Sequence, residues 1–106
     1  MPRLRAAGYL NDLDVARSLV RRRSRERGRA LIAQELSALG ISRSLAAQAL
    51  AELSDEAQAN AARRLIDSAP RHEERRLAGR LQRRGFAPSQ VRRLLAERVD
   101  DEPAVD

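Results

Sequence analysis

Two stretches of the chain carry the same pattern of apolar and glycine residues at a fixed offset of 45 positions. The matched pairs are Ile32 with Leu77, Leu36 with Leu81, Gly40 with Gly85, and Ile41 with Phe86. An internal repeat of this length is typical of stacked helical units, none of which can bury its apolar face alone. Proteins built in this way usually present a surface to a partner rather than a catalytic pocket.

The composition favours helices over a sheet. The chain has 106 residues, of which 42% are hydrophobic, but it contains one Phe, one Tyr and no Trp. The core must therefore come from Leu, Ile, Val and Ala, because β-branched and aromatic residues are too scarce for several strands. We predict an all-α protein of about six helices, arranged as tandem three-helix repeats.

Glycine residues mark the predicted helix ends. Gly8, Gly40 and Gly85 each precede a large apolar residue, and such a pair predicts a helix stop. Residues 4–8 then form the last turn of one helix, and Asn11 or Asp12 caps the next.

Serine and proline residues set the remaining boundaries. Ser42 or Ser44 is expected to cap a short helix, and Ser54 to start another. Pro70 ends that helix, and Pro88 suits the first position of the last one.

These boundaries divide the chain into repeats. We expect residues 1–25 to be the remnant of a first three-helix repeat and residues 26–69 to be a complete second repeat. Residues 70–99 would supply two helices of a third repeat, and residues 100–106 an acidic, disordered tail.

The apolar residues that follow the glycines, Tyr9, Ile41 and Phe86, have two possible roles. Exposed, they could stack on nucleic-acid bases. An apolar residue beside a glycine cap normally packs back onto its own helix, however, so we expect all three to lie in the core.

Several classes of function are disfavoured. The chain has no cysteine and one histidine, His72, and it shows no phosphate loop, metal-ligand spacing or Ser/His/Asp order. Its acidic pairs lie near helix starts, where capping and the helix dipole explain them. We therefore predict a protein that is not an enzyme and needs no cofactor. No apolar run is long enough to span a membrane and no signal peptide is evident, so we expect a soluble, cytoplasmic protein.

The basic residues are the best candidates for function. All 21 are arginine, an excess that GC-rich coding bias can explain, although guanidinium groups also pair well with phosphates and carboxylates. Six of the nine residues from 21 to 29 are basic and one is acidic. Such a density favours binding to phosphates or to an acidic protein groove over a merely solvated face. The candidate binding residues in this run are Arg21, Arg22, Arg23, Arg25, Arg27 and Arg29.

A second cluster occupies one predicted helical stripe nearer the C-terminus. Its candidate binding residues are Arg76, Arg80, Arg83 and Arg84. Binding and solvation are equally good interpretations of this cluster.

Several segments occur in an order that is typical of one protein family. They are Gly8-Tyr9-Leu10-Asn11-Asp12, Val15-Ala16, the basic run to Gly28, the helix Ile32 to Leu39 with Gly40-Ile41, and Arg80 to Phe86 followed by Val91. Their order and spacing over residues 4–98 resemble the RecX family, the regulators of the bacterial recombinase RecA. Compared with that family, the chain is short at its N-terminus and lacks most of the first repeat.

The resemblance implies a regulatory protein of DNA repair and the SOS response. Its partner would be the RecA filament on single-stranded DNA, whose ATPase and strand-exchange activities it would reduce, with possible direct contact to DNA. The alternative is a helical module that binds nucleic acid by itself.

Overall fold

The computed structural model describes residues 6–101, and within them the side chains of residues 11–73 and 75–97. These residues contain no strand. They form six α-helices and one short 3₁₀ helix: α1 (Ala6–Arg23), α2 (Arg29–Ala38), α3 (Arg43–Ala51), α4 (Asp55–Ser68), η1 (Arg71–Glu73), α5 (Glu74–Arg83) and α6 (Pro88–Asp101). The predicted all-α class and the number of helices are confirmed.

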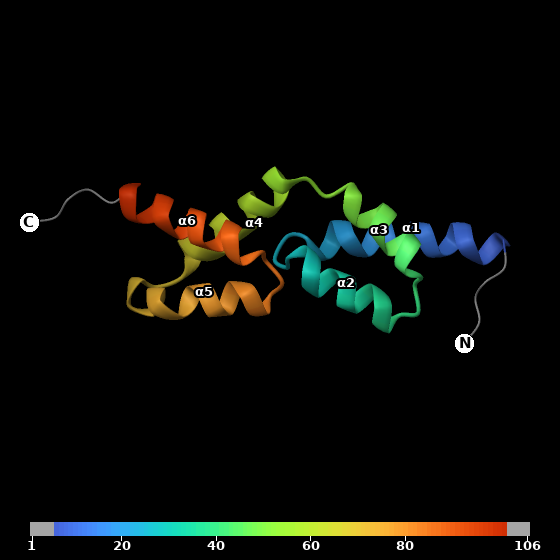
Figure 1. The fold of residues 1–106 in the computed structure, drawn as a ribbon, viewed down its shortest axis with the longest axis horizontal. Helices are drawn as coiled ribbons and strands as arrows, with labels where there is room; N and C mark the ends of the chain where they lie inside the picture. The colour runs from blue at the N-terminus through green and yellow to red at the C-terminus, as the bar shows by residue number, and fades with distance from the viewer. Residues whose placement is uncertain (1–5, 102–106) are drawn as a thin grey trace, which may run out of the picture.

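The helices form two units that lie end to end in an elongated molecule of 64 × 21 × 19 Å (Figure 1). The first unit comprises α1, α2 and α3, and the second comprises α4, α5 and α6. Each unit has a hydrophobic cluster of its own. Over the described residues, no helix is both long and apolar enough to cross a membrane.

The repeated residues occupy equivalent places in the two cores. Each member of the four pairs that define the repeat, the two glycines excepted, is at most 6% exposed. The two units are therefore built on one packing scheme. The side chain of Tyr9, which was also predicted to be buried, lies outside the described side chains.

The helices that pack together are not the ones that the predicted repeats group together. One cluster contains buried residues from Ala16 to Leu53, and the other from Ala59 to Leu94. The predicted boundaries lay instead between residues 25 and 26 and between 69 and 70. A fixed sequence offset defines the length of a repeat but not its starting point, so only the contacts between helices can show which three pack together.

Two matching turns end the middle helix of each unit. Gly40 and Gly85 have φ angles of 83° and 99°, in the left-handed region that favours glycine. In both turns, the amide of the next residue donates a hydrogen bond to the preceding helix. Ile41 N–H donates to the Leu36 carbonyl and Phe86 N–H to the Leu81 carbonyl, each with an N···O distance of 3.1 Å. This is the Schellman pattern, and the apolar residue after each glycine is buried as predicted.

The first helix differs from the prediction. It was expected to stop at Gly8 and restart at Asn11 or Asp12, yet α1 continues without a break from Ala6 to Arg23. A glycine inside a helix costs only about 1 kcal/mol relative to alanine, and burial of Ala16 and Leu19 outweighs that cost.

Most of the other boundaries were predicted correctly. The Ser42 hydroxyl caps α3 and the Ser54 hydroxyl caps α4, while Pro88 is the first residue of α6. At the C-terminus, α6 includes Asp100 and Asp101, which were expected in the disordered tail. The rest of that tail lies outside the described residues.

The two turn glycines should respond differently to substitution. A β-carbon on Gly40 meets nothing within 4 Å, whereas one on Gly85 would lie 2.4 Å from the backbone nitrogen of Leu31. We expect Gly40→Ala to lower the free energy of unfolding by about 1–2 kcal/mol through backbone strain alone. Gly85→Ala should cost about 3 kcal/mol or more, because it adds a steric clash. Chemical denaturation of both variants measures the difference, and equal losses would contradict it.

Candidate functional site

The C-terminal part of the arginine run forms the joint between the two units, which we define as residues 25–30 with their partners on the second unit. Three consecutive backbone carbonyls of this segment accept hydrogen bonds from side chains of the second unit. Arg64 Nη2 donates to the Arg25 carbonyl (3.2 Å), Arg84 Nη1 to Glu26 (3.2 Å) and Gln58 Nε2 to Arg27 (3.3 Å). The main chain of the run is thus fixed by residues far away in the sequence.

The next three amides complete the joint. Gly28 N–H donates to the Arg84 carbonyl (2.8 Å), Arg29 N–H to Gln58 Oε1 (3.0 Å) and Ala30 N–H to the Gly85 carbonyl (3.3 Å). Helix α2 has no side-chain cap of its own. Because the first amides of a helix have no partner within it, the second unit supplies the cap of α2.

The backbones approach closely where the joint forms. A β-carbon on Gly28 would lie 2.2 Å from the carbonyl carbon of Gly85. Only glycine therefore fits at position 28.

Two arginines of the run pair with one carboxylate within the first unit. Arg27 forms a short ion pair with Glu35, and Arg23 Nε lies 3.7 Å from Glu35 Oε1. The side chains of Arg27 and Glu35 are 28% and 24% exposed. At this degree of burial, solvent screens the pair less than a fully exposed one.

Arg29 is held at the joint as well. Its guanidinium donates to the Leu53 carbonyl and lies 2.8 Å from Asp55 Oδ1. It therefore connects the start of α2 to the segment that leads into α4.

The remaining arginines of the run are free to meet a partner. Arg21, Arg22 and Arg25 are exposed, and among the described residues their guanidinium groups have no ion pair or hydrogen bond. We call these three the free triplet. The structure thus divides the six predicted binding residues into three that are held internally and three that point to solvent.

The second predicted cluster divides in the same way. Arg80 lies 2.6 Å from Glu73 and Arg84 takes part in the joint, whereas Arg76 and Arg83 are exposed. The hydrogen bond from Arg80 is the main cause that lowers the pKa of Glu73.

Sequence reasoning missed two residues of the joint. Gln58 is only 2% exposed, and its side-chain amide donates to the Arg27 carbonyl and accepts from the Arg29 N–H, on either side of Gly28. A glutamine one turn before Ala62, on the apolar stripe of α4, was the available signal. For Arg64, which reaches the Arg25 carbonyl, the sequence held no such signal.

The described residues contain no group of three or more His, Cys, Asp or Glu side chains that could hold a metal ion.

The division of the arginines can be tested by stability. Glu35→Gln should lower the free energy of unfolding by about 1 kcal/mol, because it removes the partner of both Arg23 and Arg27. The matched control Arg22→Gln should stay within about 0.5 kcal/mol of the unmodified chain, since its side chain is exposed. Urea denaturation compares the two, and a larger loss for Arg22→Gln would contradict the assignment.

The Glu73–Arg80 pair should make the stability of the folded chain depend on pH. A lowered carboxyl pKa means that the ionised form stabilises the folded state above the ordinary carboxyl pKa, and that this stability is lost as the pH falls through the folded-state pKa. The unmodified chain should therefore melt at a higher temperature than Glu73→Gln at neutral pH, and this difference should shrink as the pH falls below the ordinary carboxyl pKa. Thermal melts of both proteins from pH 7 to pH 3 measure the difference. Arg80→Gln should behave like Glu73→Gln, and a difference that stays the same from pH 7 to pH 3 would contradict the prediction.

Comparison with known proteins gives one match. Residues 11–50 match the family model described as RecX, second three-helix domain. No curated protein and no solved structure matches the chain. The matched residues fall within the first unit and include the whole arginine run, and the three-helix description agrees with the packing of α1, α2 and α3. Residues 11–50 of the chain are therefore similar to the second three-helix domain of RecX.

Proposed function

We propose that the chain binds the RecA filament on single-stranded DNA and reduces its ATPase and strand-exchange activities. The observation that supports the proposal is the match to RecX over residues 11–50, the segment that also contains the free triplet. RecA works on DNA in the cytoplasm, so the protein would act there. A second role, direct contact with DNA, would use the same guanidinium groups.

The physical properties of the free triplet support binding to an anionic surface. Guanidinium groups stay charged and form forked contacts with carboxylates and phosphates. The formal net charge of the chain is +6, which favours association with an acidic partner. The elongated shape allows contacts spread along a filament rather than confined to one point.

Inhibition further requires that the chain distinguish between states of the filament. A ligand shifts a conformational equilibrium only by the difference in its affinity for the two states. The free triplet would therefore bind more tightly to an inactive or disassembling filament than to the active one.

Charge reversal tests the binding surface. Arg22→Glu with Arg25→Glu should weaken inhibition of the filament ATPase by roughly tenfold or more, because an interfacial arginine commonly contributes about 1–2 kcal/mol. Arg92→Glu with Arg93→Glu makes the same change in net charge on α6 and should have a much smaller effect. The measurement is RecA ATPase on single-stranded DNA against the concentration of each protein. Equal weakening by both variants would show that only net charge matters.

The alternative function is direct binding of nucleic acid, which the three unpaired arginines also favour. Fluorescence anisotropy of labelled single-stranded DNA without RecA distinguishes the two. Tight binding would support the alternative if the logarithm of its association constant falls steeply with the logarithm of salt concentration. Inhibition of the filament without measurable binding to bare DNA would support the regulator.

A further inference from the structure

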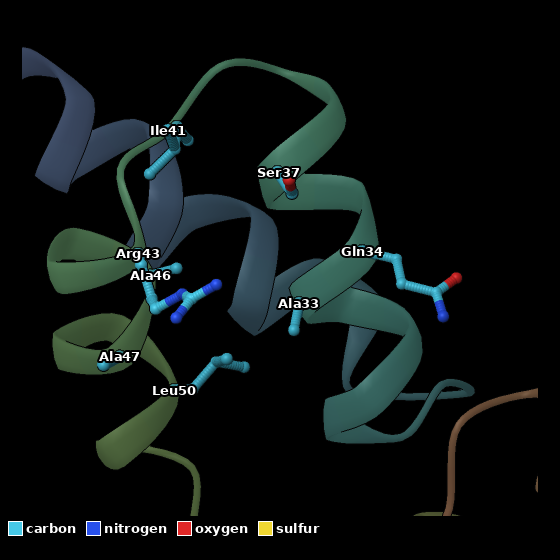
Figure 2. Close-up of a pocket in the computed structure, with 8 residues that line it drawn as sticks. All are labelled: Ala33, Gln34, Ser37, Ile41, Arg43, Ala46, Ala47 and Leu50. Atoms are coloured by element: carbon cyan, nitrogen blue, oxygen red, sulfur yellow. The ribbon is translucent and has the colours of Figure 1, made fainter.

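A groove lies between α2 and α3 on the first unit (Figure 2). Its volume is about 380 Å³, and its lining is mostly apolar, with Ala33 on α2, Ile41 in the turn, and Ala46, Ala47 and Leu50 on α3. Ala33 and Leu50 point toward each other from the two helices. Side chains this short at the centre would allow the backbone of a partner to come close.

One cation lies over this groove. Arg43 is the first residue of α3, and its guanidinium extends toward α2 (Figure 2). It is exposed and has no ion pair or hydrogen bond within the described part of the chain. By contrast, Arg17 lies 2.7 Å from Glu52 and Arg29 lies 2.8 Å from Asp55.

Arg43 favours binding of an anion because it is unpaired among the described residues, and also because of its position at the start of α3. The N-terminus of a helix carries partial positive charge, so an arginine in its first turn is in an unfavourable field. A carboxylate beside Arg43 would relieve that field and pair with the guanidinium at once.

The second unit lacks these features at the equivalent positions. At the offset of 45, Arg43 corresponds to Pro88, Ala46 to Val91 and Ala47 to Arg92. The counterpart of Arg43 is an uncharged proline, and the larger side chains of Val91 and Arg92 replace two alanines. The open groove and its unpaired charge thus occur together on the first unit, although both units share one packing scheme.

We propose that this groove docks an amphipathic helix of an acidic partner protein, with an alanine- and leucine-rich face against α2 and α3 and a carboxylate paired with Arg43. Two helices lying side by side present ridges and grooves that a third helix can match, at axis separations of about 8–10 Å where side chains are short. The net charge of +6 adds attraction for an acidic helix. The groove residues differ from the free triplet, so this contact goes beyond the proposed function and does not depend on it.

A selection experiment identifies the chemistry of the occupant. A phage library of amphipathic helical peptides, with both acidic and basic variants, is selected on the immobilised full-length chain. Counter-selection uses Ala47→Arg, which places in the groove the residue found at the equivalent position of the second unit. Position 47 is exposed, so this variant should fold normally, and circular dichroism with a thermal melt checks it.

The expected result is a set of peptides that share one Asp or Glu beside an apolar helical face. Arg43→Glu should weaken their binding by roughly tenfold, as expected for loss of one charge-assisted contact. Replacing the peptide carboxylate by arginine should restore binding to Arg43→Glu.

Three outcomes would overturn the proposal. The first is that no peptides are enriched. The second is that the enriched peptides bind Ala47→Arg as tightly as the unmodified chain or lack a shared acidic position. The third is concentration-dependent dimerisation in analytical ultracentrifugation that Ala47→Arg abolishes, because the groove would then bind a second copy of the chain.

Discussion

The hydrogen bonds that join residues 25–30 to the second unit determine how this chain is organised. Without them, a segment so rich in arginine would have little reason to adopt one conformation, because its charges repel one another and the segment has few apolar side chains to bury. Residues 25–30 form their six hydrogen bonds to the second unit through backbone groups, and the Arg29 side chain adds an ion pair with Asp55. The sequence of the run can therefore be strongly charged while its main chain stays fixed.

Fixing the main chain also determines where the charges go. Glu35 pairs with Arg23 and Arg27, and Asp55 pairs with Arg29, whereas Arg21, Arg22 and Arg25 remain exposed. Arginines held in this way lose little further side-chain entropy, but they also cannot reach a partner. Those that remain free present charge from a rigid base, which reduces the entropy lost when a partner binds.

Local chemistry made much of the fold predictable. Gly40, Gly85 and Pro88 act through their own backbone preferences, so their roles could be inferred from the sequence, as could burial of Ile41 and Phe86 beside the glycine caps. The continuity of α1 through Gly8 could not, since it depends on packing that outweighs a weak local preference. The same holds for the candidate site. The sequence located the arginines, but their division into held and free side chains depends on Glu35, Asp55 and the Leu53 carbonyl, whose contacts only the folded chain reveals.

The six hydrogen bonds of the joint also have a mechanical consequence. Bending one unit against the other would stretch several of these bonds at once, and Gly28 and Gly85 leave no space for the backbones to slide past each other. The molecule should then behave as a single rigid body, 64 Å long, rather than as two units joined by a flexible linker. Charges on its two halves are held at a constant spacing, so a partner with a regular repeat could be recognised by its period as well as by its chemistry.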